Sequence, residues 1–267
     1  MAQWKVEGPQ RVPFDGEVKR LDVLLARGRL SVVGVPGPAR LEVTSVGRKP
    51  VLVDQDSERL TISHWPPGQG GRHNPFYWWW FGGHYDCEMT LAVPAEIVAD
   101  ITVVHGRVAV SGLQAQTTVD VTSGRVSLLG LAGRTRAKLV SGPVEALGVG
   151  GDLTMETVSG DLTLAQSSAE RVHAVTVSGA ITCDVDSSTP ADLRLTTTSG
   201  DITIRVPAGA DLDVRLAAVS GNVTTSFPLQ SEGIGRHNRS MRGRIGAGGG
   251  RLDAASTSGN VALLAGE

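Results

Sequence analysis

Apolar and polar side chains alternate in short segments along much of the chain, as they do in strands with one buried face. The clearest segments are Asp-Leu-Thr-Leu at 161–164, Asp-Ile-Thr-Ile at 201–204 and Asn-Val-Thr-Thr at 222–225. Val, Ile, Thr and Leu dominate them, and such side chains suit a pleated surface. No repeated segment keeps an apolar period of 3.6 residues, and the frequent glycines disfavour helices. The pattern therefore predicts an all-β fold.

A Ser-Gly pair recurs between these segments, with its serines at Ser123, Ser141, Ser159, Ser178, Ser199, Ser220 and Ser258. Starting from His105-Gly106, successive glycines are 18, 18, 18, 19, 21, 21 and 38 residues apart. Two strands and a turn in each period form one coil of a solenoid, and stacked coils bury a continuous apolar column. We therefore expect a parallel, right-handed β-helix (a β-solenoid) with coils of 18 to 21 residues. The last interval equals two periods and predicts a degenerate coil or an insertion.

A second glycine, six residues after the first, extends the repeat toward the N-terminus. The spacing occurs at Gly106/Gly112, Gly124/Gly130, Gly142/Gly148 and again at Gly28/Gly34. We therefore expect a single β-solenoid domain over residues 1–267. An antiparallel sandwich or a propeller is the alternative, but the constant step of 18 residues in the middle of the chain disfavours both.

An aromatic segment interrupts the repeat, with six consecutive aromatic residues, Phe76, Tyr77, Trp78, Trp79, Trp80 and Phe81. The Pro- and Gly-rich sequence before it and the glycines after it predict a long loop insertion over 66–85. Such a segment is a candidate surface for self-association, a protein partner, a glycan or a membrane interface. The alternative is a cap that covers an open face or end of the solenoid.

Charge is distributed unevenly, although the formal net charge is only −2. Residues 139–230 contain 11 acidic residues and four arginines, whereas 231–251 contain one glutamate and five arginines. This second segment predicts a Gly/Arg-rich insertion over 230–251, whose candidate binding residues are Arg236, Arg239, Arg242 and Arg244. They suit an acidic partner or the acidic flank of the solenoid itself. No nucleic acid is expected, because no aromatic residue is interleaved with the arginines.

Carboxylates are the candidate groups for an enzyme that cleaves polysaccharides, which needs two of them close together. The candidates are Asp152, Asp161, Asp184, Asp186, Asp201, Asp211 and Asp213. Asp161 and Asp201 follow the Ser-Gly corner at the position that Asn222 and Asn260 occupy in other repeats. A recurring Asp or Asn is explained more simply by turn chemistry than by catalysis.

The sequence gives little support for a metal site or a reactive cysteine. His64, His73, His84 and Cys87 match no zinc pattern. Cys87 and Cys183 fall on the apolar positions of their strands, and Cys183 aligns with Leu164 and Ile204, so we expect two buried cysteines. The sequence predicts no catalytic residues, no metal and no cofactor.

The repeated unit Thr-x-Ser-Gly-Asp-Ile/Leu-Thr-Ile/Leu, at 157–164 and 197–204, resembles the repeat of a bacterial "putative adhesin" family of unknown function. The segments 28–34, 91–94, 243–248 and 257–261 fit the same family. The resemblance implies a β-helix-like fold and a link to envelope stress, and it supplies no catalytic residues.

These observations predict a non-catalytic β-solenoid scaffold for protein interaction or self-assembly. The alternative is an adhesin-like surface or glycan-binding protein, and an enzyme active on polysaccharides comes third. The first residues lack the apolar core of a signal peptide, and no stretch has the length and apolarity of a transmembrane helix. A cytoplasmic location is therefore expected.

Overall fold

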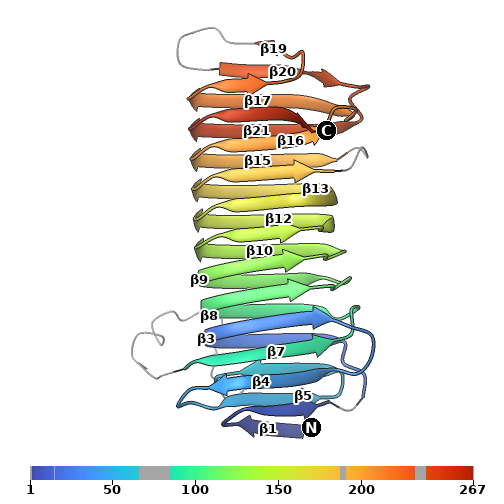
Figure 1. Cartoon of the computed structure of the whole chain (residues 1–267), viewed down its shortest axis with the longest axis vertical. Helices are drawn as coiled ribbons and strands as arrows, with labels where there is room; N and C mark the ends of the chain where they lie inside the picture. Colours follow the sequence, from blue (N-terminus) through green and yellow to red (C-terminus); the bar gives the residue numbers. More distant parts are fainter. Residues whose placement is uncertain (1, 15, 66–84, 187–190, 232–238, 267) are drawn as a thin grey trace. The chain divides into compact units, whose positions relative to one another are not determined.

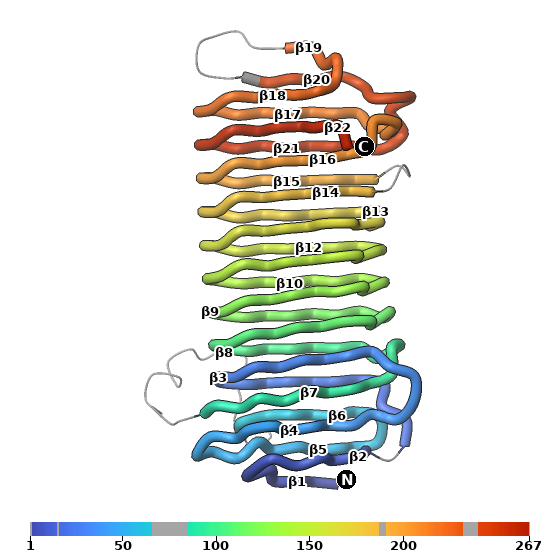
Figure 2. The backbone as a smooth tube through the Cα atoms, viewed as in Figure 1, coloured from blue at the N-terminus to red at the C-terminus, as the bar shows by residue number. Residues whose placement is uncertain are grey.

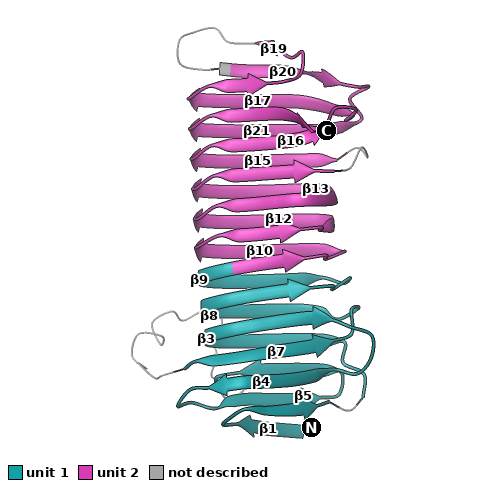
Figure 3. Cartoon of the chain, in the orientation of Figure 1, with its two compact units in different colours: residues 1–125 teal, residues 126–267 magenta. Residues whose placement is uncertain are grey.

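The computed structural model describes residues 2–14, 16–65, 85–186, 191–231 and 239–266. All regular elements in these ranges are β-strands, and most of them pair in parallel, which confirms the predicted β-solenoid. The chain divides into two compact units, residues 1–125 and residues 126–267 (Figure 3). Each unit is described below by itself.

Unit 1 is built around one long strand, β3 (Arg20–Gly34). On one side it pairs in parallel with β8 (Val98–Ser111). On the other side its first half pairs with β6 (Arg59–Ser63) and its second half with β7 (Cys87–Val93), again in parallel. β6 and β7 are therefore two halves of one coil, separated in sequence by the insertion that contains the aromatic segment (Figure 1).

Two further layers of unit 1 pair in antiparallel fashion. β4 (Arg40–Val46) lies along β7, and β5 (Val51–Asp56) lies along β6. β1 (Ala2–Val6) then pairs with β5, and β2 (Gln10–Pro13) pairs with β4. The parallel stack of unit 1 thus ends in layers whose direction alternates. Figure 2 shows β1, β2, β4 and β5 at the N-terminal end of the chain.

Unit 2 contains the regular coils. Its first series of parallel strands runs through β10 (Arg134–Ser141), β12 (Gly150–Ser159), the second half of β13 (Leu162–Ser178) and β15 (Asp192–Ser199). Its second series runs from the end of β9 (Thr117–Leu129) through β11 (Val144–Leu147), the first half of β13, β14 (Ile181–Val185) and β16 (Ile202–Pro207).

The last coil does not follow chain order. β21 (Gly250–Ser258) lies between β15 and β17 (Leu212–Ser220), in parallel with both. β22 (Val261–Gly266) likewise lies between β16 and β18 (Val223–Thr225). β19 (Gln230–Ser231) and β20 (Arg239–Ile245) form an antiparallel cap on the other edge of β17. The interval of 38 residues therefore contains the cap. After the cap the chain turns back, and its last coil, β21 and β22, lies between two coils that precede it in the sequence.

The core of unit 2 is a set of apolar columns that run from coil to coil. In one column Leu164, Cys183, Ile204 and Leu263 face each other in register, and none is more than 1% exposed. The predicted alignment of Cys183 with Leu164 and Ile204 is therefore confirmed. The outward positions just before them are Thr163, Thr182, Thr203 and Ala262, so alternation places one face of each strand in the core.

Glycine is required at the Ser-Gly corner because consecutive coils approach there without room for a side chain. A Cβ atom on Gly160 would lie less than 3.0 Å from the backbone oxygen of Gly142. The φ angle of Gly160 is +156°, which L side chains rarely adopt. The Gly160 N–H donates a hydrogen bond of 2.9 Å to the Ser178 carbonyl of the next coil. The repeated glycine thus joins neighbouring coils through the backbone.

The residues around the glycine complete this corner. The Asp161 carboxylate accepts a hydrogen bond from the Ala180 N–H (2.8 Å), and Asp201 accepts one from the Asn260 N–H (2.7 Å). The Thr197 hydroxyl donates to the Gly179 carbonyl across 3.2 Å. The motif Thr-x-Ser-Gly-Asp therefore describes a set of bonds between coils, which supports turn chemistry as the role of these aspartates.

Replacing Gly160 with alanine is expected to lower the free energy of unfolding by about 3 kcal/mol, because the added Cβ meets backbone and the φ angle becomes strained. Gly209→Ala is the matched control, since nothing lies within 4 Å of a Cβ at that position. Urea unfolding followed by circular dichroism compares the two variants. Equal stability of both would contradict the account of the corner.

Engineered disulfides test the position of the last coil. Ala262 faces Thr203 on one side and Thr224 on the other. Neighbouring strands lie about 4.8 Å apart, within reach of a disulfide, whereas strands two apart do not. The double cysteine variants 203/262 and 224/262 should therefore oxidise to a cross-link, and 203/224 should not. If the coils followed chain order, positions 203 and 224 would be neighbours and the 203/224 variant would form the cross-link. Mass spectrometry detects the disulfide in each variant.

Candidate functional site

The predicted aromatic surface, Phe76, Tyr77, Trp78, Trp79, Trp80 and Phe81, lies outside the described residues, so it stays a prediction. The structure does show where the insertion starts and ends. It interrupts its coil at the corner. A Cβ on Gly28 would collide with the backbone of Cys87, whereas a Cβ on a corner glycine of unit 2, such as Gly160, would collide with the backbone of another corner glycine. Cys87, the first residue of β7, thus lies where other coils have the corner glycine.

Three rings gather where the insertion leaves the coil. The centroids of Trp65 and Tyr85 are 5.8 Å apart, and the His64 ring lies 6.1 Å from Trp65 and 5.4 Å from Tyr85. His64 is 5% exposed, and its Nδ1 accepts a hydrogen bond from the Ala26 N–H (3.1 Å). No hydrogen-bond partner of its Nε2 is found in the part of the chain that the structure describes. Burial lowers the pKa of His64 to about 4, against a smaller opposing effect of Asp86.

Both cysteines are buried free thiols, as predicted. Burial raises the pKa of Cys87 and of Cys183 to about 12. Since the thiolate is the nucleophile and the metal ligand, neither side chain is prepared for such chemistry. Among the described residues, no group of three or more His, Cys, Asp or Glu side chains is arranged to hold a metal ion.

His64 is expected to make stability fall in mild acid. Its folded pKa of about 4 lies below an unfolded value of about 6.5, so the unfolded chain binds the extra proton between these values. The stabilisation is complete above pH 6.5 and is lost toward pH 4, by up to about 3 kcal/mol. Urea unfolding at several pH values should show that His64→Leu removes part of this slope. His105→Gln, at an exposed histidine, is the control, and an unchanged slope in His64→Leu would contradict the assignment.

The described part of the predicted arginine-rich insertion is mostly β-strand. Residues 239–245 form β20, which pairs with β17, and Arg242 and Arg244 are exposed opposite Arg215 and Asp213. Arg236 lies outside the described residues, and for Arg239 only the backbone is described. β19 pairs with β20 at Arg242 and Met241, on the side of β20 away from β17. The described part of this segment belongs to the cap of the last coils, and binding by its arginines stays a prediction.

Five of the seven carboxylates considered for catalysis contact neighbouring chain segments. Asp152 accepts two hydrogen bonds from the Arg171 guanidinium (2.7 and 2.9 Å), and these lower its pKa. Asp211 accepts a hydrogen bond from the Gly248 N–H in the turn before β21. Asp184 lies 3.9 Å from Arg205, and Asp161 and Asp201 bond to the next coil. These contacts support a structural role for the group.

A row of exposed apolar side chains follows the coils of unit 2. Each valine precedes the serine of a Ser-Gly corner, and Val140, Val158 and Val177 are 52%, 50% and 49% exposed. The pairings on both sides of these positions place the three on adjacent coils. Thr198, Thr257 and Val219 continue the same row, which we call the valine row. It is a candidate contact surface that the sequence analysis did not single out.

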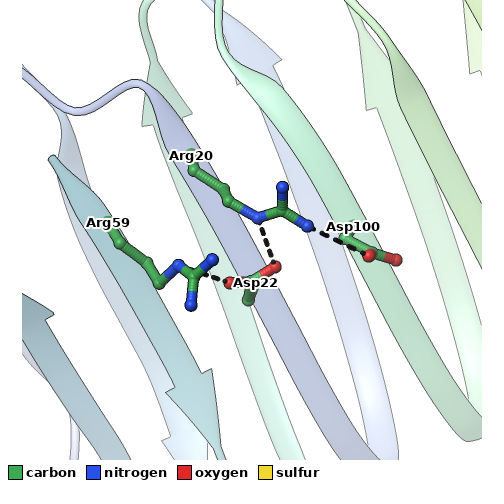
Figure 4. A network of polar contacts seen from close by, with 4 residues as sticks. All are labelled: Arg20, Asp22, Arg59 and Asp100. Atoms are coloured by element: carbon green, nitrogen blue, oxygen red, sulfur yellow. Dashed lines mark hydrogen bonds and ion pairs between the residues drawn. The ribbon is translucent and has the colours of Figure 1, made fainter.

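A second candidate lies on the outward face of unit 1, where Arg20, Asp22, Arg59 and Asp100 form a network of ion pairs beside a hollow (Figure 4). The sequence analysis missed these residues as well. The alternation of outward positions in 20–24 is visible in the sequence. Which strands lie beside it depends on pairing between segments that are far apart along the chain.

Parallel coils stacked through Ser-Gly corners define the chain as a β-solenoid. The family model Toastrack DUF4097 matches residues 85–264, more than half of the chain, and the chain belongs to this family. The Ser-Gly-Asp repeat family that the sequence resembles is a finer assignment and stays a prediction.

One solved structure is described as a "putative cell adhesion protein" from Clostridium sporogenes ATCC 15579. It aligns with 97% of this chain and 100% of its own, at 10% identity and a TM-score of 0.28, which is too low to carry an argument. No curated protein matches the sequence significantly. In the described ranges, no helix is long and apolar enough to cross a membrane.

Proposed function

We propose that this chain is a non-catalytic β-solenoid scaffold that associates with further copies of itself through the valine row of unit 2. The observation that carries the proposal is the exposure of Val140, Val158 and Val177 on three adjacent coils. Single exposed apolar residues are common on protein surfaces, whereas a contiguous set indicates a contact surface.

A second copy is the partner that this row suits, because both surfaces then have the same period. Coils repeat about every 4.8 Å, so the valines of one row can fit between those of another, as identical side chains do in stacked β-structures. Such a contact is isologous and closes as a dimer. Three valines bury little area compared with the roughly 1,000 Å² of a stable interface, so weak, concentration-dependent association is expected.

The absence of a catalytic role is supported by the contacts of the carboxylates. Asp152, Asp161, Asp201 and Asp211 each hold a neighbouring coil or turn. A general acid or base needs freedom to exchange a proton with a substrate, and these groups are committed to hydrogen bonds within the fold.

Light scattering after size exclusion tests the proposal across a range of protein concentrations up to about 1 mM, which covers weak dimers. We expect the wild-type mass to rise with concentration. Val140→Thr/Val158→Thr/Val177→Thr should remain a folded monomer, since threonine already occupies the row at positions 198 and 257.

A variant with the opposite effect serves as the control. Thr198→Val lengthens the valine row by one coil, because position 198 lies beside Val177, and it should strengthen association. A wild-type chain that stays monomeric, or association that neither variant changes, would contradict the proposal.

A further inference from the structure

The hollow of unit 1 has a volume of about 530 Å³ and lies on the outward face of five adjacent strands, β1, β5, β6, β3 and β8. Pockets of this size are typical of small-ligand sites. Most of its lining residues belong to the face that points away from the core, and the core residues Val23 and Val53 also reach it.

Polar side chains cross the floor of the hollow in a row, because the strand register aligns them. The row consists of Gln3, Asp54, Thr61, Asp22 and Asp100. The row next to it includes Ser63 and Thr102 together with Leu24 and Leu52. Amide, carboxylate and hydroxyl groups thus follow one another at the spacing of strands, about 4.8 Å. They offer both donors and acceptors to a ligand that lies across the strands.

The charges of this floor are balanced. The Arg20 Nε lies 3.2 Å from Asp22 Oδ1, and its Nη2 lies 3.6 Å from Asp100 Oδ2. Arg59 Nε approaches the other oxygen of Asp22 to 3.2 Å (Figure 4). The lining contains three cations, Lys5, Arg20 and Arg59, and three aspartates, so its formal charge is zero. A site of this kind selects neither an anion nor a cation by bulk charge.

The network also fixes the orientation of its groups before a ligand arrives. Asp22 forms ion pairs with two arginines, Arg20 and Arg59. The Gln3 side-chain amide donates a hydrogen bond of 2.6 Å to Asp54. Side chains that are already held in place lose less conformational freedom on binding. This arrangement favours a ligand with many hydrogen-bonding groups in a rigid frame.

An aromatic side chain borders the same hollow. Trp65 lines it and is held by Tyr85 and His64, and its backbone N–H donates to Ser63 Oγ across 2.9 Å. The face of an indole attracts C–H groups and buries a large area with few torsions. A ring with C–H groups on one face and hydroxyls at its rim would use both the indole and the polar row.

We infer that this hollow binds a neutral saccharide, with sugar hydroxyls on the row from Asp54 to Asp100 and a sugar ring against Trp65. Hydroxyl groups both donate and accept, so they pair with carboxylates, guanidinium groups and threonines alike. The sugar needs no charge, because the floor has none to neutralise. This inference does not depend on self-association, since the valine row belongs to unit 2.

Isothermal titration calorimetry with cellotriose, maltotriose and chitotriose as probes tests the inference on the full chain. We expect at least one to bind, at concentrations up to about 10 mM. Trp65→Ala should weaken binding at least tenfold. Thr61→Phe should do the same by filling the floor without removing a core side chain. Circular dichroism establishes that each variant is folded.

Arg29→Ala is the matched control, since Arg29 is an exposed residue of β3 that pairs with Glu88 and does not line the hollow. Its binding should stay within twofold of wild type. Three results would overturn the inference: no binding of any trisaccharide, binding that survives both Trp65→Ala and Thr61→Phe, or tighter binding of trigalacturonate or an uncharged tripeptide than of every neutral trisaccharide.

Discussion

The close approach of one glycine backbone to the next, at the corner of each coil, is the contact on which the rest of the solenoid depends. In unit 2 the N–H groups of Gly142, Gly160, Gly179, Gly200 and Gly259 each donate to a serine carbonyl of the neighbouring coil, over 2.8 to 2.9 Å. A side chain on Gly160, Gly179, Gly200 or Gly259 would meet the backbone of the neighbouring coil and force the coils apart. Because the corner sets the register, it also decides which side chains enter the core and which form outward rows.

The same constraint explains how the last coil can occupy a place out of chain order. Gly259 packs against Gly200, and Gly221 packs against Gly259, so the wedged coil uses the same corner contacts as coils in sequence. Asp201 and Asn260 continue the bonds between coils through this point. The corner contacts are therefore the same whether or not the coils follow chain order, and β20 and β21 pair with opposite edges of β17.

The sequence was sufficient to predict the class of fold, because the corner chemistry is local. The Ser-Gly spacing, the alternation in 161–164 and the buried positions of Cys87 and Cys183 all follow from short segments. The sequence predicted a degenerate coil or an insertion in the last interval, but it did not predict the order of the last coils, since every coil has a similar edge and the sequence does not show which pair is adjacent. Residues 239–245 were predicted only as part of an insertion, and they form a strand because they pair with β17, which lies far away in the sequence.

The candidate surfaces were harder to predict, because each depends on register between distant segments. The valine row needs three coils in alignment, and the hollow needs β1, β5, β6, β3 and β8 side by side. Arg20 and Asp100 are 80 positions apart and are joined only through the pairing of β3 with β8. The aromatic segment, which the sequence made conspicuous, lies outside the described residues.

Amide hydrogen exchange at the corner glycines tests the central claim most directly, since it reports on each contact between coils without any substitution. The account predicts slow exchange at Gly142, Gly160, Gly179, Gly200 and Gly259, with similar protection along the series, and fast exchange at exposed Gly209. Exchange at the five corner glycines as fast as at Gly209 would show that the corners do not hold the coils together.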